Sequence, residues 1–111
     1  MRVHLNRKLV LEAPQRVQDG AGGHSEVWTA VGTVWAQVTA GTGREIAGQF
    51  VTVSSVPYKI VVRGAPVGAP SRPKPDQRFR EGSRIYRILA VSEYDANARY
   101  LICHAKEEVA T

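Results

Sequence analysis

The side chains that most often carry chemistry in proteins are scattered in this sequence. The three histidines, His4, His24 and His104, lie far apart, and none belongs to a group of cysteines or carboxylates at metal-ligand spacing. No serine occupies a nucleophile elbow, and the glycine-rich stretch GAGG at 20–23 precedes a predicted strand, whereas a phosphate-binding loop would open a helix. The sequence therefore predicts a protein that is not an enzyme and that holds no metal or other cofactor.

Basic residues, by contrast, gather in one part of the chain. The net charge is +5, and residues 59–87 hold eight basic residues against two acidic ones, Asp76 and Glu81. We interpret this basic zone as a surface for a polyanionic partner, either a nucleic acid or an acidic protein surface. Its members are Lys59, Arg63, Arg72, Lys74, Arg78, Arg80, Arg84 and Arg87.

A small basic β-barrel that binds nucleic acid is one alternative function for this zone. Single-strand binders place aromatic side chains between positive charges on a strand, and Tyr86 and Tyr100 lie near Arg84, Arg87 and Arg99. Aromatic residues make up only 7% of the chain, and most stand at expected core positions. We therefore favour core packing for the two tyrosines. No predicted helix is long enough to be a recognition helix.

A proline-rich segment, GAPVGAPSRPKPDQRF, occupies residues 64–79. Its prolines at 66, 70, 73 and 75 favour polyproline II and lower the entropy lost on docking. Fully extended, residues 64–77 would reach roughly 45 Å. We expect an extended arm that lies on a neighbouring subunit, the alternative being a disordered surface loop.

The elements that must carry these residues are mostly strands. Residues 27–39 alternate with period two, with Gly32 as a predicted bulge, and further strands are expected at 8–13, 58–63, 85–91 and 100–105. The first strand should end at Pro14, and one short helix is expected at 44–50. Long loops at about 40–57 and 64–77 complete the chain. The predicted fold is all-β: a small antiparallel β-barrel of about six strands, as a single domain over residues 1–111.

Cysteine content and hydropathy indicate the cellular environment in which the protein is expected to fold. Cys103 is the one cysteine, and its apolar neighbours predict a buried thiol. No apolar run is long enough to span a membrane, and charged residues interrupt the N-terminal segment where a secretory signal would need an apolar core. These features predict a protein that folds in a reducing, intracellular environment and does not enter a membrane.

Read in order, several motifs resemble one protein family. They are D-x-x-G-G at 19–23, W-x-x-V-x-T-V-W-A at 28–36, a strand ending at Arg63, R-I-Y-R-I at 84–88, and a last strand ending in C-x-A-x-E. The order and spacing resemble the phage head–tail joining family, the head closure or stopper proteins of long-tailed bacteriophages and gene transfer agents. The resemblance covers residues 9–107.

This resemblance implies a structural connector. In the family a ring, twelvefold in its known members, lies between the portal with its adaptor and the tail terminator or tail tube. The ring closes the DNA exit channel without sequence-specific contact. For this chain the resemblance implies a place in the neck of a virion or phage-like particle, assembled in the bacterial cytoplasm. By position, its channel-facing loop would include Gly41, Thr42, Gly43, Arg44 and Glu45.

Charge placement divides the basic zone further. We expect Arg63, Arg84 and Arg87 to pair with acids or carbonyls at subunit contacts, with Glu107 and Glu108 of the next subunit as possible partners. We expect the other basic residues of the predicted interface to face the adaptor or the tail: Arg72, Lys74, Arg78 and Arg80. Pro73 and Pro75 complete the predicted interface.

Overall fold

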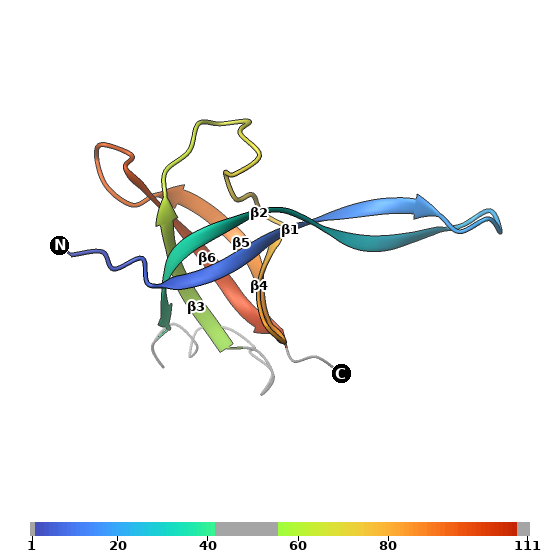
Figure 1. Cartoon of the computed structure of the whole chain (residues 1–111), viewed down its shortest axis with the longest axis horizontal. Coiled ribbons are helices and arrows are strands. Elements are labelled where there is room, and N and C mark those ends of the chain that lie inside the picture. Colours follow the sequence, from blue (N-terminus) through green and yellow to red (C-terminus); the bar gives the residue numbers. More distant parts are fainter. Residues whose placement is uncertain (1, 42–55, 109–111) are drawn as a thin grey trace.

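Six antiparallel strands close into a barrel in the computed structural model, which describes residues 2–41 and 56–108 (Figure 1). The strands pair in the order β1-β2-β3-β6-β5-β4 around the barrel, and β4 returns to β1. This confirms the predicted all-β barrel. The strands are β1 (Arg7–Gln18), β2 (His24–Ala40), β3 (Val56–Arg63), β4 (Arg78–Glu81), β5 (Arg84–Glu93) and β6 (Tyr100–Glu108).

The core fills the inside of the barrel with alternate side chains from every strand. Leu9 and Leu11 of β1 face Phe79 of β4 and Tyr86 of β5, all fully buried. Cys103 is buried among them, as predicted, and burial raises the pKa of its thiol to about 12. Tyr86 is therefore a core residue and is not available for stacking on a nucleic-acid base.

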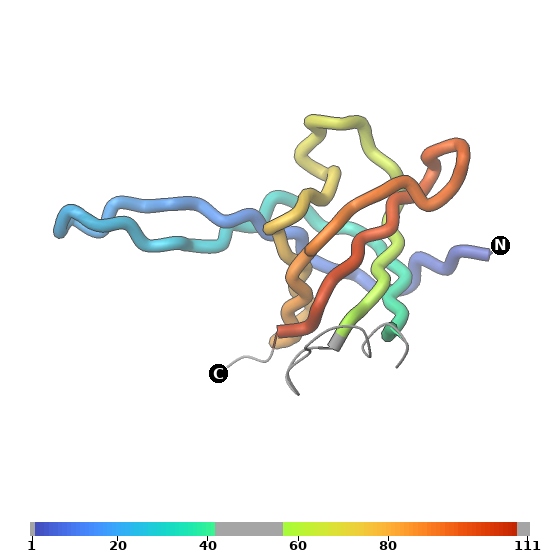
Figure 2. Tube along the Cα trace, turned by 180° about the vertical axis from the view of Figure 1, so that it is seen from behind, coloured from blue at the N-terminus to red at the C-terminus, as the bar shows by residue number. Residues whose placement is uncertain are grey.

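Strands β1 and β2 continue well beyond the barrel as a two-stranded hairpin, which we call the arm (residues 13–29; Figures 1 and 2). The first strand does not end at Pro14, contrary to our expectation. From Ala13 onward β1 pairs with β2 alone, so its other edge is free, and proline is tolerated in such edge strands.

The predicted bulge is present where the arm leaves the barrel. Leu11 opposes Gly32 whereas Glu12 opposes Ala30, so Val31 is the extra residue. A bulge bends a strand and increases its twist. Here it marks the change from six-stranded barrel to two-stranded arm.

Strand β4 was not among the strands expected from the sequence. Only four residues long, it pairs with β5 across the two-residue turn Gly82–Ser83. Gly82 has φ +60° at the first central position of this turn, which is where a type II′ hairpin requires glycine. Burial of Phe79 stabilises this short strand. Four residues are too few to show a strand pattern in the sequence.

The proline-rich segment is not an extended arm in this chain. Ala69 N–H donates to Pro66 O, and Arg72 N–H to Ala69 O, each at 3.0 Å, so the segment turns back on itself. The Arg72 side chain donates to Ala65 O at 2.8 Å, and Pro73 is fully buried. The segment therefore forms a compact loop that packs on its own barrel through the buried Pro73. The helix predicted at 44–50 lies outside the described residues.

Candidate functional site

The tip of the arm is an ordered turn built on Asp19. Its Oδ1 accepts hydrogen bonds from the N–H groups of Ala21 at 2.8 Å and Gly23 at 3.1 Å. Gly20 and Gly22 have φ values of +81° and +84°, a region open to glycine. These contacts explain the D-x-x-G-G motif as a structural requirement of the tip.

The base of the arm is fixed by what we call the outer arginine cluster, made of Glu12, Trp28, Arg78, Arg80 and Arg87. Glu12 is 5% exposed and accepts from Arg78 Nε at 2.7 Å and Arg80 Nε at 2.8 Å. Burial raises the pKa of the Glu12 carboxyl, but the bonds to Arg80 and Arg78 outweigh it and hold the pKa below its usual value. Trp28 lies under the guanidinium groups of Arg78 and Arg87, 4.1 Å and 5.4 Å from its ring centroid.

A second charged group closes one end of the barrel, and we call it the barrel-end network. Each member stands two residues from a core residue of its strand, so the alternation of the strand points it inward. Arg7 pairs with Glu81 and donates to Tyr86 Oη at 3.2 Å. The members of the barrel-end network are Arg7, Tyr58, Glu81, Arg84, Tyr86 and Glu107.

Within this network, Arg84 joins strands β3, β5 and β6. Its Nε donates to Glu107 at 2.8 Å, and its Nη2 donates to Tyr58 Oη at 3.1 Å. The Tyr58 and Tyr86 rings meet edge-to-face at 5.2 Å, and Arg84 lies beside both. The bond to Glu107 raises the pKa of Arg84 and lowers that of Glu107.

The structure thus changes the interpretation of the basic zone. Arg78 and Arg80 bind Glu12, Arg84 binds Glu107, and Arg87 lies 3.7 Å from Asp76 and 3.9 Å from Glu108. Glu107 and Glu108 therefore pair with arginines of their own chain. The sequence had suggested arginines of a neighbouring subunit as their partners. Four arginines of the predicted interface are largely neutralised inside one molecule.

Other predicted residues divide between the loop and the undescribed segment. Lys74 and Pro75 are exposed on the compact loop, whereas Pro73 is buried and Arg72 is half-buried. Of the predicted channel-facing loop only Gly41 is described, and its N–H donates to Pro57 O at 2.8 Å. Thr42, Gly43, Arg44 and Glu45 lie outside the described residues.

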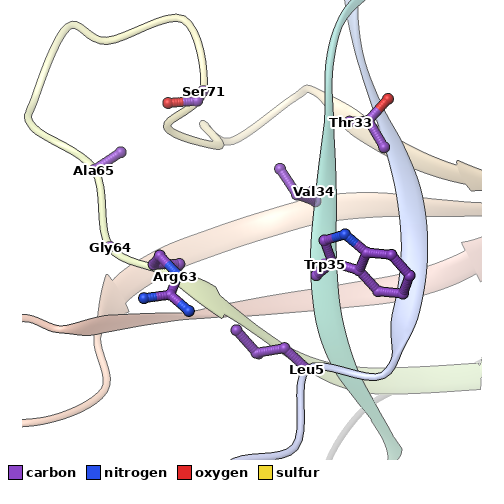
Figure 3. A pocket seen from close by; sticks show the side chains of 8 residues that line it. All are labelled: Leu5, Thr33, Val34, Trp35, Arg63, Gly64, Ala65 and Ser71. Atoms are coloured by element: carbon purple, nitrogen blue, oxygen red, sulfur yellow. The ribbon is translucent and has the colours of Figure 1, made fainter.

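A pocket of about 620 Å³ with a mixed apolar and polar lining lies between the N-terminal segment, β2 and the start of the proline-rich loop (Figure 3). Trp35 stands at its edge with 55% of the residue exposed. Lys8 opposes Trp35 on β1, and Arg63 lines the pocket from the end of β3. In the described residues neither cation has an acidic partner. We call this surface the docking patch: Leu5, Lys8, Thr33, Trp35, Arg63 and Ser71.

Sequence reasoning included Arg63 in the predicted interface but overlooked Trp35 and Lys8. The signal was present, because Trp35 shares a strand face with Thr33 and Gln37, which is the polar side of β2. A tryptophan on a polar face is an exposed aromatic residue, and such residues are enriched at protein interfaces.

No group of three or more potential metal ligands occurs among residues 2–41 and 56–108. Every buried side-chain polar atom described has a hydrogen-bond partner. Across the same residues no helix has the length and apolarity to cross a membrane.

A closed small barrel with a projecting hairpin and an exposed docking patch defines a binding or assembly module. The sequence matches the phage head completion protein family over residues 1–108, and the chain belongs to this family. Membership confirms the predicted function class, a structural protein of phage-like particles with a head closure or connector role.

Two of the solved structures that resemble the chain are a gene transfer agent virion and a protein from Shigella flexneri 2a. A chain of the virion of a native gene transfer agent particle is 62% identical, with a TM-score of 0.79, and the match covers 100% of this chain and 99% of that chain. A solution structure of a protein from Shigella flexneri 2a is 18% identical with a TM-score of 0.69, covering 99% and 96%, and it shows a shared fold. No curated protein matches the sequence.

Proposed function

We propose that this chain forms a ring in the neck of a phage-like particle, where it closes the DNA exit channel and receives the tail. The observation that carries the proposal is the 62% identity over the full chain to a protein of a gene transfer agent virion. At that identity we expect the barrel, the arm and the docking patch to have the same role in assembly as their counterparts in that virion protein. The role is structural and needs no catalysis.

The expected neighbours follow from this position. On the head side the ring contacts the portal or its adaptor, and on the other side it contacts the tail terminator or the tail tube. The stoichiometry we propose is twelvefold, with assembly in the bacterial host cytoplasm. Packaged DNA passes through the ring without sequence-specific contacts.

The charge distribution supports contact with DNA that is weak and unspecific. Four arginines of the basic zone bind carboxylates of their own chain, and a paired guanidinium attracts a phosphate less than a free one does. The same pairing, with the burial of Tyr86, disfavours the alternative of a nucleic-acid-binding barrel. A gel-shift assay with single-stranded DNA at physiological salt should show little binding.

Deletion of the gene in a particle-producing strain tests the proposed function. Electron microscopy should show heads without tails that have lost their DNA, and a plasmid copy of the gene should restore tailed particles. Tailed, filled particles from the deletion strain would contradict the proposal.

A further inference from the structure

The arm is the least supported part of the molecule. Six residues of each strand project beyond the barrel, and this two-stranded ribbon spans about 20 Å. A two-stranded ribbon without a covering layer is marginally stable in water. Val17 and Val27 on one of its faces are each 43% exposed, and the free edge of β2 offers unpaired backbone groups. These features indicate a surface that another protein covers.

Charge restricts which surface can cover the arm. Residues 13–29 hold one arginine against two acids, so the arm has a net charge of −1 and the rest of the chain has +6. Glu26 is exposed and forms no ion pair in the described structure, although Arg16 opposes it across the two strands of the arm. The arm is thus a partly apolar and slightly acidic part of a strongly basic protein, so a surface that is apolar and basic complements it.

The docking patch has that character. Trp35 and Leu5 provide apolar surface beside a pocket of about 620 Å³, and Arg63 contributes a positive charge at its wall (Figure 3). Lys8 adds a second positive charge on the strand beside Trp35. Ion pairs formed on such a partly enclosed surface are screened less than those on an open one.

The arm of a molecule cannot reach its own docking patch. Trp35 and the tip of the arm lie on the same strand, separated by roughly 35 Å of extended backbone. In Figures 1 and 2 the arm leaves the barrel on the side away from the N-terminus, whereas Leu5 of the patch belongs to the N-terminal segment. Two complementary surfaces at opposite ends of one chain favour a head-to-tail contact between copies.

We propose that the arm of one subunit binds the docking patch of a second copy of this chain. A repeated contact of this kind is heterologous and closes into a ring when the rotation between copies permits. The inference rests on the proposed ring and specifies its contact. The outer arginine cluster then has a role in assembly, because it fixes the direction of the arm toward the next subunit.

Cysteine cross-linking in assembled particles tests this contact. A chain with both Val27→Cys and Thr33→Cys places one thiol on the arm and one at the patch, and both positions are exposed. Cys103 does not interfere, because it is buried with a pKa of about 12. Mild oxidation should give a ladder at multiples of 12.2 kDa on a non-reducing gel. The matched control, Val27→Cys with Ser83→Cys, moves the second thiol to the β4–β5 turn and should give none.

Three results would overturn the inference. The first is tailed particles that give no ladder. The second is a dimer from Val27→Cys alone, which would indicate arm-to-arm pairing. The third is a cross-link to a different protein. Each leaves the proposed function standing, since that function is judged by the tails and DNA of the deletion strain.

In the cross-linking chain, Arg63→Glu should lower the ladder yield several-fold, whereas Lys74→Glu, an exposed change outside the patch, should not. Equal yields from the two would also count against the inference.

Discussion

Arg78 holds Trp28 and Glu12 together at the point where the arm leaves the barrel. Its guanidinium carbon lies 4.1 Å from the Trp28 ring centroid, and its Nε donates to Glu12 at 2.7 Å. Three strands meet in this contact: β1 supplies Glu12, β2 supplies Trp28 and β4 supplies Arg78. The exposed arm is therefore fixed by one largely buried carboxylate and one stacked arginine.

Replacing Glu12 with glutamine should destabilise the protein by about 2–3 kcal/mol. The change removes the negative charge that Arg78 and Arg80 share, and the Arg78 side chain, only 17% exposed, keeps its charge without a carboxylate partner. Urea unfolding of the purified chain measures the loss. Glu26→Gln, on the exposed arm, is the matched control and should change stability by about 0.5 kcal/mol or less. Similar losses from both would show that Glu12 has no special role.

Stability should fall as the pH drops below about 4.5, the ordinary pKa of a glutamate side chain. The pKa of Glu81 is lowered by its hydrogen bond to Arg7, that of Glu107 by Arg84, and that of Glu12 by its two arginines against the effect of burial. Below that pH the unfolded chain binds protons that the folded chain still excludes, so protons favour unfolding.

Urea unfolding at a series of pH values checks this dependence. Above about pH 5 these three carboxylates are ionised in both states, so their contribution is constant and fully present. It is lost progressively as the pH falls from about 4.5 through the lower folded-state values. Glu12→Gln should show a shallower acid slope, because one of the three groups no longer titrates. An unchanged slope in this variant would rule out Glu12 as a source.

The barrel could be predicted from sequence because its strands alternate. Inward positions in the long strands, such as Leu9, Ile60 and Cys103, are apolar. This alternation indicates that the segments are strands and shows which face of each strand points into the core. The four-residue strand β4 has a single core residue, Phe79, so no period can be recognised in it. Its existence depends on pairing with β1 and β5, which are remote from each other in sequence.

The partners of the arginines could not be predicted for a related reason. Glu12 and Arg78 are 66 positions apart, and only the closure of the barrel through the β1–β4 pair places them side by side. Charge counting found the basic zone but assigned its acids to a neighbouring subunit. The arm was also missed, because Pro14 is a strand-ending residue in most contexts and only the free edge of β1 permits it here.

Two glycines should respond in opposite ways to alanine. A Cβ on Gly64 would clash with the backbone carbonyl oxygen of Ala98 and lie 3.1 Å from that of Arg99, and the Gly64 N–H donates to this second oxygen at 2.7 Å. Gly64→Ala should therefore cost about 2 kcal/mol or more, because the proline-rich loop and the β5–β6 turn must separate.

Gly32→Ala is the matched change. A Cβ on Gly32 meets no atom within 4 Å, and its φ is not in the left-handed region. Alanine restricts the unfolded chain more than glycine does, so this variant should be unchanged or up to about 1 kcal/mol more stable. Thermal unfolding of both variants decides the point. A loss at Gly32 as large as that at Gly64 would indicate that the bulge requires glycine.

The two tryptophans of the chain should separate folding from assembly. Trp28 lies beneath Arg78 and Arg87, so Trp28→Ala removes two cation–π contacts and should cost about 1–2 kcal/mol in urea unfolding. Trp35 is 55% exposed, so Trp35→Ala should leave the stability of the isolated chain within about 0.5 kcal/mol. If Trp35 lies in the contact between subunits, however, its loss should sharply reduce incorporation of the protein into particles, measured by immunoblot of purified virions. A Trp35→Ala protein that folds normally and enters particles at the wild-type level would remove Trp35 from the interface, and an unstable one would show that its exposed ring serves the fold.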